Sequence, residues 1–540
     1  MMTFTSWNFW VFFGAVFLVH AGIGQVFAHR PHRWQTIFRS ALLLAMSLGF
    51  YALAAGKLVV LILASILVNH VMAWQIFSTK KGWRTMWTAI AISANTLALG
   101  VFKYAYFIAD VFQMSWTWRV GNWRLDQWML PLGISFFTFQ AISYVIDVHR
   151  GTLSRPAPLL QFATYLTFFP QLVAGPIVRA GTFLPQLQAK SWGGQVARSK
   201  PHVLRLLSGM LKKLLLGDLL GAWLVDPVFA EPGHQHGAVI LLALYGYSLQ
   251  VYADFSGYTD MAKGMAGLLG IELPENFNFP YRARTPAEFW RRWHMTLSSW
   301  WKDYVYIPIG GNRSFSLCTI SFALTLVVGF AWRWGEPGGA LILGGAGLLM
   351  ASAALMWQSF SRRLATGLNV LLVMLLGGLW HGAHENFVMW GAINGLFLMA
   401  WSMTRPELDR WWKRALAWML TFHVVVFSRI WFRAGSLLHW DETTESPHPE
   451  DAWQTAVLLW ERVRHSWEYQ LECSETLTWS LGLLGTGFAL HFLPSSKRNL
   501  LRTACLSLPL PVLWAVWCAC ALLAVWCEST YSKPFIYWQF

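Results

Sequence analysis

Apolar stretches of about twenty residues, each long enough to cross the hydrocarbon core of a bilayer, recur along most of this chain. Trp7 to Ala28 is one of them, and Ala41 to Phe77 has room for two helices separated by a turn at Gly56–Lys57. Only 12% of the 540 residues are charged, against about 25% in an ordinary soluble domain. Too few charges remain to cover a water-exposed surface, which argues against a soluble enzyme, a coiled coil or a disordered chain. The sequence therefore predicts an all-α polytopic membrane protein.

The remaining apolar stretches predict further membrane-spanning helices. They run over residues 86–112, 129–148, 203–230, 236–254, 316–334, 339–358, 365–380, 386–403, 411–432, 477–494 and 508–527. With the first three, these stretches give roughly eleven to fourteen crossings or re-entrant pieces.

The basic residues predict how the chain is oriented in the membrane. The formal net charge is +15, but the cations form short clusters between apolar runs, which is typical of cytoplasmic loops rather than of nucleic-acid binding. Arg30, Arg33 and Arg39 directly follow the first apolar run, so we expect a periplasmic N-terminus and a cytoplasmic first loop. No Lys or Arg precedes that run and no cleavage pattern follows it, so we do not expect a cleaved signal peptide.

Two regions interrupt the apolar pattern. Residues 271–315 mix cations with many aromatic residues, a mixture that predicts amphipathic helices and a loop at the cytoplasmic interface. Residues 434–476 hold nine acidic and two basic residues, which predicts a water-exposed insertion. We therefore divide the chain into a transmembrane core at 1–435, an acidic extramembrane insertion at 436–476 and C-terminal transmembrane helices at 477–540.

His381 is the first candidate for chemistry, because ionisable groups at membrane depth are costly and functional by default. It lies between two apolar segments in the glycine-rich stretch 377–395, and imidazole is the natural general base near neutral pH. The alternative is a buried histidine that only bonds to a neighbouring helix. His384 lies three positions on and is followed by Glu385, but the order HxxHE is not a zinc-protease pattern, so we expect no metal.

His294 and Asp254 are further candidates. His294 lies in 288–313 beside Arg291 and Arg292 and among tryptophans, which suits a site for an anionic, nucleotide-bearing donor. The composition alone favours the alternative, a membrane-interface belt with cations reaching toward water. Asp254 lies in an apolar segment and must pair or line a wet cavity; it would orient a base or satisfy an arginine such as Arg179.

Several catalytic motifs are missing from the sequence. It contains no GxSxG nucleophile elbow, no Walker loop and no GxGxxG dinucleotide fingerprint. Any acyl transfer by this chain must therefore use something other than a serine-hydrolase triad.

Over roughly residues 100–435 the chain resembles the membrane-bound O-acyltransferases, and within them the alginate O-acetyltransferase branch. The similarity rests on several motifs that occur in family order. They are QAISYVIDVHRG at 140–151, YLTFFPQLVAGPIVRAGTFLPQL at 165–187, GMLKKLLLGDLL at 209–220, the segments 247–283 and 288–313, GGLWHGAHENFVMWGAINGLFL at 377–398 and SRIWFRAG at 428–435.

The resemblance implies a ring of tilted helices around a central tunnel, with interfacial amphipathic helices. It also implies that His381, in GLWHG, matches the histidine held to be catalytic, and that His294 matches the family's second histidine. We expect Asp254, Trp380 and Asn394 to support the site, although Asn394 stands where members of the family often carry histidine.

The resemblance further implies an inner-membrane O-acetyltransferase that takes acetyl groups from cytoplasmic acetyl-CoA. The acceptor would be an exported, alginate-like polysaccharide, reached through a periplasmic partner protein. His381 would act as general base or as a transient acyl carrier, and Arg291, Arg292 and Lys302 are candidates for binding the donor phosphates. Three alternatives stay open: D-alanyl transfer from a carrier protein, a transporter or flippase without acyl chemistry, and a scaffold that only docks a periplasmic enzyme.

Overall fold

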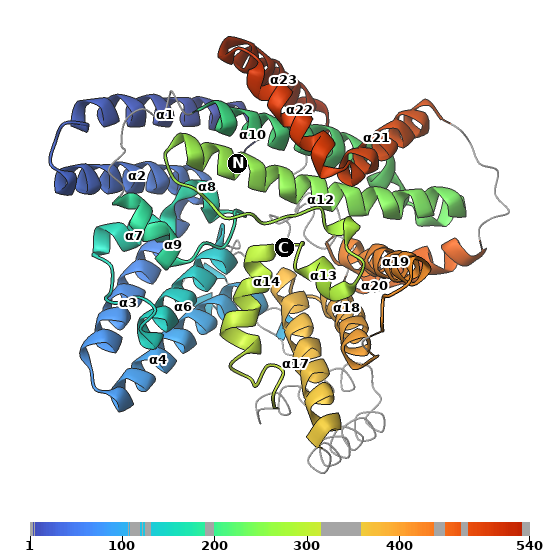
Figure 1. Cartoon of the computed structure of the whole chain (residues 1–540), viewed down its shortest axis with the longest axis horizontal. Helices are drawn as coiled ribbons and strands as arrows, with labels where there is room; N and C mark the ends of the chain where they lie inside the picture. The colour runs from blue at the N-terminus through green and yellow to red at the C-terminus, as the bar shows by residue number, and fades with distance from the viewer. Residues whose placement is uncertain are drawn as a thin grey trace.

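The computed structural model of the chain is built almost entirely of helices, as the sequence predicts (Figure 1). It describes residues 4, 6–105, 107–108, 119–120, 123–124, 131–188, 199–314, 358–404, 406–436, 449–465 and 474–531. Of the expected spans, 316–334 lies outside the described residues, and 339–358 does so except for its last residue.

The first half of the chain contains most of the short elements. In order they are α1 (Trp7–Phe27), α2 (His32–Ala55), η1 (Gly56–Leu58), α3 (Val59–Ser78), α4 (Lys81–Leu99), η2 (Gly100–Tyr104), the two-residue strands β1 (Arg119–Val120) and β2 (Trp123–Arg124), α6 (Ile134–Arg150), α7 (Leu159–Thr167), α8 (Phe169–Leu172), α9 (Ala180–Leu187), α10 (Lys200–Leu211), η4 (Lys212–Leu219), η5 (Gly221–Val225), α11 (Asp226–Ala230), η6 (Pro232–His234) and α12 (Gly237–Leu268). Strands β1 and β2 pair antiparallel.

The second half begins with short helices and continues with long ones. In order they are η7 (Pro280–Arg282), α13 (Pro286–Trp290), α14 (Met295–Trp301), η8 (Lys302–Tyr306), α17 (Gln358–His381), α18 (Glu385–Thr404), α19 (Trp411–Ser436), α20 (Pro449–His465), α21 (Glu475–Phe492), α22 (Ser495–Ser507) and α23 (Leu510–Tyr531).

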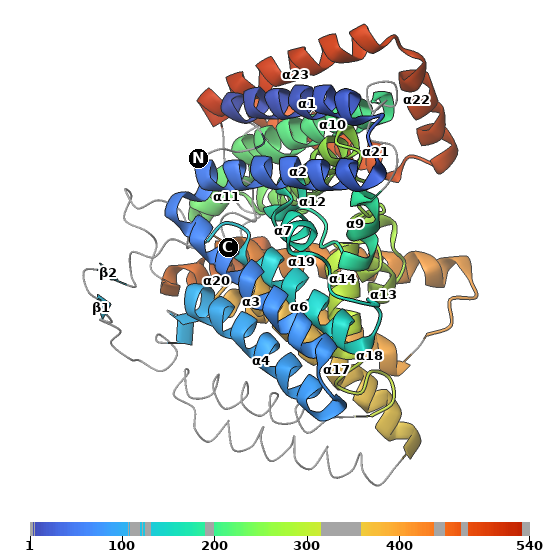
Figure 2. The same cartoon turned by 90° about the vertical axis from the view of Figure 1, so that its left-hand side faces the viewer.

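Three groups of helices surround the centre of the molecule. Helices α3, α4 and α6 pack together on one side, α10 and η4 pack along α12, and α17, α18 and α19 form the third group (Figures 1 and 2). The short segment from α13 to α14 lies between α12 and α17 in Figure 1. Helices α12, α14 and α17, which are far apart in the sequence, thereby lie near one another at the centre of the molecule.

Seven helical stretches among the described residues are long and apolar enough to cross a membrane, or eight if the bent pair α21–α22 counts as one. The longest of the seven, His32–Ser78, has 47 residues, about twice what a bilayer needs. Gly56, with φ of +55°, breaks it into α2 and α3, which confirms the turn expected at Gly56–Lys57.

The described residues of the aromatic segment 271–315 form the short helices η7, α13, α14 and η8, and three of its rings differ from the expected arrangement. Phe289, Trp293 and Trp300 are buried within the protein, so these rings do not form the expected interfacial belt. Composition could not separate the two arrangements, because aromatic residues are common both at membrane interfaces and in packed cores.

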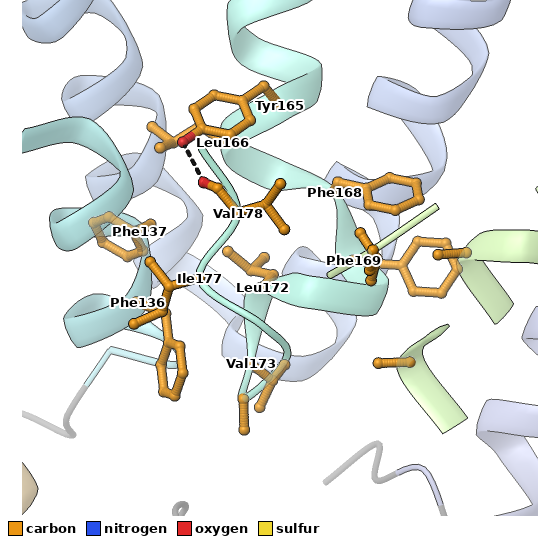
Figure 3. Packing of buried hydrophobic residues seen from close by; sticks show 14 of the residues in the cluster. Phe136, Phe137, Tyr165, Leu166, Phe168, Phe169, Leu172, Val173, Ile177 and Val178 are labelled. Carbon is orange, nitrogen blue, oxygen red and sulfur yellow. Dashed lines mark hydrogen bonds between the residues drawn. The ribbon is translucent and has the colours of Figure 1, made fainter. Parts of the chain in front are cut away.

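Aromatic and aliphatic side chains from α6, α7, α8 and the following loop form a dense core (Figure 3). Within it the Tyr165 hydroxyl donates to the carbonyl oxygen of Val178 at 2.8 Å. Phe136, at the edge of this core, lies 5.6 Å from Trp380 between ring centroids. The core is thus continuous with the residues around His381.

Candidate active site

His381 is the last residue of α17 and lies among aromatic rings from three helices. Its ring centroid is 5.0 Å from that of Trp380, 5.2 Å from that of Trp390 in α18, and 5.2 Å from that of Phe432 in α19. Only 4% of the residue is exposed. Rings packed in this way exclude bulk water from the imidazole, and electrostatic interactions are strong in such a place.

His294 is fixed by the loop between α13 and α14. The residue has φ of +42°, an unusual backbone conformation outside glycine, and its side chain is 1% exposed. Its Nδ1 lies 3.1 Å from Oδ1 of Asn276. That oxygen must be an acceptor, because the backbone N–H and the hydroxyl of Thr296 both donate to it, at 3.2 and 2.9 Å.

The Asn276 contact therefore fixes the tautomer of His294. In the neutral ring Nδ1 carries the proton and Nε2 holds the lone pair. Burial lowers the pKa of His294 to about 3, so the imidazole is neutral near pH 7 and can accept a hydrogen bond through Nε2.

Trp380 joins the two histidines. Its ring centroid lies 6.1 Å from that of His294 and 5.0 Å from that of His381, and Phe139 stacks on it at 5.5 Å. The two candidate histidines belong to separate motifs and contact the same indole, His294 from the residue before α14 and His381 from the end of α17.

Asn394 supports the wall of this site. Its Nδ2 donates to the carbonyl oxygen of Trp390 at 2.9 Å and to the Ser428 hydroxyl at 3.1 Å. The amide thereby links α18, which carries Trp390, to α19, which carries Phe432. The supporting role of Asn394 stays a prediction, and these two hydrogen bonds are made to the helices that carry Trp390 and Phe432.

Asp254 has a different partner from the one considered above. It binds Lys213 Nζ at 2.6 Å, and Asp218 binds the same ammonium at 2.8 Å. Arg179 instead lies 3.4 Å from Asp303. The proposed Asp254–Arg179 pair is therefore wrong, and Asp254 belongs to a buried ion cluster that connects α12 with η4.

The three candidate phosphate-binding cations differ in their surroundings. Arg292 binds Glu288 at 2.7 Å and donates to the carbonyl oxygen of Asn278 at 3.2 Å, so its guanidinium holds this segment together. Arg291 is exposed. Lys302 has a side chain that is 62% exposed and lies 3.6 Å from Asp303.

His384 has a structural contact. Its Nδ1 accepts a hydrogen bond from the backbone N–H of Asn386 at 3.1 Å, near the start of α18. Nowhere in the described part of the chain do three His, Cys, Asp or Glu side chains gather in a way that would ligate a metal.

Two residues that contact this site, Lys103 and Asn276, were not predicted from the sequence. Lys103 Nζ donates to the carbonyl oxygen of Trp380 at 2.5 Å. Its place inside the apolar stretch 86–112 could have marked it as a candidate, because a charged residue in an apolar stretch is costly. Asn276 lies in a loop, and nothing in the sequence indicates that its side chain reaches His294.

Comparison with known proteins shows which family the chain belongs to. The model of the membrane-bound O-acyltransferase family matches residues 150–332. The "Probable alginate O-acetylase AlgI" of Pseudomonas aeruginosa is 33% identical over 405 residues, covering 74% of this chain and 68% of the relative.

Two other relatives carry different names. The "Peptidoglycan O-acetyltransferase" of Helicobacter pylori is 31% identical over 76% of this chain and 73% of its own length. The "Teichoic acid D-alanyltransferase" of Bacillus subtilis is 26% identical over 55% of this chain and 67% of its own length. The chain belongs to the membrane-bound O-acyltransferase family and is an O-acyltransferase.

Proposed function

We propose that this O-acyltransferase carries acetyl groups from cytoplasmic acetyl-CoA across the bacterial inner membrane for O-acetylation of an exported, alginate-like polysaccharide. The observation that carries the proposal is the meeting of His294 and His381 at the indole of Trp380. The relatives named as O-acetylases support the acetyl group and the polysaccharide, since they match more of the chain than the D-alanyltransferase does.

In the proposed reaction His381 is the general base. It accepts the proton of the attacking hydroxyl while the hydroxyl oxygen bonds to the thioester carbonyl carbon. The carbon–sulfur bond then breaks, and the imidazolium returns the proton to the departing CoA thiolate. His294, held neutral with its Nδ1–H toward Asn276, offers Nε2 as a hydrogen-bond acceptor on the donor side.

The route of the acetyl group follows from where the reactants are. CoA is cytosolic and too highly charged to cross a bilayer, whereas the polymer is modified after export. We propose that a periplasmic partner protein receives the acetyl group and passes it to the polymer. The central tunnel remains the expected path between the two faces.

The first test replaces His381 by alanine. Loss of a general base lowers the rate by about 100- to 10,000-fold, measured as base-labile acetate on the exported polymer at equal protein level in the membrane. His423→Ala is the matched control, because His423 lies on the neighbouring helix α19 and its Nδ1 contacts only a backbone carbonyl, that of Met419. Normal acetylation in H381A would refute the role of His381.

The second test identifies the donor. Membrane vesicles that expose the cytoplasmic face are supplied with radiolabelled acetyl-CoA or with a D-alanyl thioester of a carrier protein. We expect label in the polymer, and free CoA, only from acetyl-CoA. Transfer of D-alanine alone would replace this proposal by the D-alanyl alternative.

The third test concerns the donor phosphates. Because Arg292 already binds Glu288, the double variant Arg291→Ala/Lys302→Ala removes the two more exposed cations and leaves the segment intact. We expect the KM for acetyl-CoA to rise while the KM for a short phosphate-free thioester stays constant. An unchanged KM for acetyl-CoA would reject these two residues as phosphate ligands.

A further inference from the structure

The end of helix α17 requires hydrogen-bond donors from elsewhere in the protein. The last four carbonyl groups of any α-helix lack intrahelical partners, and in α17 these belong to residues 378–381. The N–H of Gly382 donates to the carbonyl oxygen of Gly378 at 3.4 Å. The carbonyl groups of Leu379, Trp380 and His381 remain, and they lie beside the candidate reacting group itself.

Two consecutive residues of η2 supply those donors. The Tyr104 hydroxyl donates to the carbonyl oxygen of Leu379 at 2.9 Å. Lys103 Nζ donates to the carbonyl oxygen of Trp380 at 2.5 Å and to that of His381 at 3.4 Å. Lys103 and Tyr104 of η2, far from α17 in the sequence, thus complete its C-terminal cap.

The side-chain nitrogen of Lys103 is surrounded by hydrogen-bond acceptors. Its three N–H groups face three acceptors, since the Ser135 hydroxyl lies 3.5 Å from Nζ in addition to the two carbonyls. Its positive charge also opposes the negative end of the helix dipole. Nζ lies 5.7 Å from the centre of the Trp380 ring, so the same charge contacts the indole that both histidines share.

The local backbone of η2 also departs from a regular helix. Gly100–Tyr104 is a π-helical turn at the end of α4, and such turns inside helices are frequent at functional sites. Here the turn ends with the two side chains that reach α17.

We propose that Lys103 and Tyr104 are positioning residues that hold the end of α17, and thereby fix the His381 imidazole and Trp380 in the arrangement needed for acyl transfer. This inference rests on the proposed role of His381. Lys103 and Tyr104 act through the backbone of α17 and need not touch the substrate.

The test compares Lys103→Met, Lys103→Gln and Tyr104→Phe in the full-length chain. Each variant replaces the native copy in its host, and transfer from radiolabelled acetyl-CoA to polymer is measured in membrane vesicles at equal protein level. Misplacement by about 1 Å can cost 100-fold in rate, so we expect kcat to fall by about that factor in K103M, with the KM for acetyl-CoA nearly constant. K103Q, which keeps two N–H donors, should retain more activity than K103M, and Y104F should lose about tenfold.

Matched controls separate positioning from general damage. Lys57→Met removes an exposed lysine at η1, and Tyr245→Phe removes a hydroxyl from a half-buried tyrosine of α12. Both should keep normal kcat. If K103M fails to accumulate, K103Q and Y104F decide the question.

Three results would overturn the inference. The first is normal kcat in K103M and Y104F, and the second is normal kcat in K103Q and Y104F if K103M does not accumulate. The third is a change in the KM for acetyl-CoA with kcat unchanged. Parallel measurement of H381A keeps this inference distinct from the proposed function. Activity in H381A contradicts the role of His381, whereas inactive H381A with normal Lys103 and Tyr104 variants contradicts only the positioning role.

Discussion

At the scale of single residues, one buried amide decides which nitrogen of His294 is basic. Asn276 accepts hydrogen bonds from both Thr296 and His294 through the same oxygen. The imidazole is thereby held in one tautomer and one orientation. Partners of this kind commonly matter almost as much as the group they orient.

Removing that amide tests its importance. We expect Asn276→Ala to lower polymer acetylation by about 10- to 100-fold, because the His294 ring can then rotate or change tautomer. Asn278→Ala is the control, since Asn278 lies two positions on and is exposed. Equal activity in N276A and N278A would contradict the orienting role.

The buried, neutral state of His294 predicts a pH dependence of stability. Its pKa is about 3 in the folded protein and about 6.5 when unfolded, so between these values the unfolded state binds one more proton. Stability is then lost as pH falls below about 6.5, by up to about 1.4 kcal/mol per pH unit from this group.

Thermal unfolding of the purified protein in detergent, from pH 7 to pH 5, measures this loss. Wild type and His294→Gln share all the other histidines. The difference between their losses of stability from pH 7 to pH 5 therefore reports on position 294 alone. We expect wild type to lose more stability than H294Q. Parallel pH curves would show that His294 is protonated without cost.

The sequence predicted several residues of the candidate site, but not Lys103 or Asn276, which contact Trp380 and His294. His381, His294 and Trp380 lie in recognisable motifs, and the structure brings all three together. Lys103 and Asn276 act through contacts between distant positions, which spacing along a chain does not reveal. The partner of Asp254 was misassigned for the same reason: several cations could have satisfied it, and only the fold selects Lys213.

At the scale of helices, close approach of α10 and α12 depends on small residues. A Cβ added at Gly257 would lie 2.8 Å from the carbonyl oxygen of Gly209, and one added at Gly209 would lie 2.6 Å from that of Gly257. Backbone atoms cannot move aside cheaply, so the two helices require glycine at both positions.

We expect Gly257→Ala to cost about 1–3 kcal/mol of stability through overpacking. Gly22→Ala in α1 is the control, because a Cβ there meets nothing within 4 Å. Alanine is favoured over glycine within a helix by up to about 1 kcal/mol, so G22A should be neutral or stabilising. Thermal unfolding in detergent compares them; equal stability of G257A and G22A would contradict the close-packing argument.

The ion cluster of Lys213, Asp218 and Asp254 joins η4 to α12. Lys213→Met leaves two buried carboxylates without their shared cation, which we expect to cost about 3–5 kcal/mol. The triple variant Lys213→Met/Asp218→Asn/Asp254→Asn removes all three charges and should recover most of that loss. Protein accumulation in the membrane and unfolding temperature measure both; equal damage in the two variants would contradict the electrostatic explanation.

Helix boundaries were more predictable than helix surroundings. The first span and the break at Gly56 followed from apolar length and a turn residue, and both are confirmed. The burial of Phe289, Trp293 and Trp300 did not follow, because the direction in which these rings point depends on helices elsewhere in the chain.

At the scale of the whole molecule, the basic loops bear on orientation in the membrane. Helix α1 is followed by a short exposed loop with His29 and Arg30, and α2 runs from there to the turn at Lys57. The 24 residues of α2 span about 36 Å, enough to place the two loops on opposite faces of a bilayer.

Cysteine labelling tests that orientation. In a background without the six native cysteines, we expect Lys57→Cys to react with a membrane-impermeant maleimide supplied from the periplasmic side. His29→Cys should react only after the inner membrane is opened. The reverse pattern would show that the N-terminus is cytoplasmic.

The contact between Lys103 and Trp380 joins residues separated by 277 positions. Ribosomes add about 5–20 residues per second, so His294 is synthesised seconds before the end of α17 has been translated. Until then Lys103 and Tyr104 have no helix end to hold, and His294 has no Trp380 to contact. The two candidate histidines can therefore meet at one indole only after the end of α17 has been synthesised.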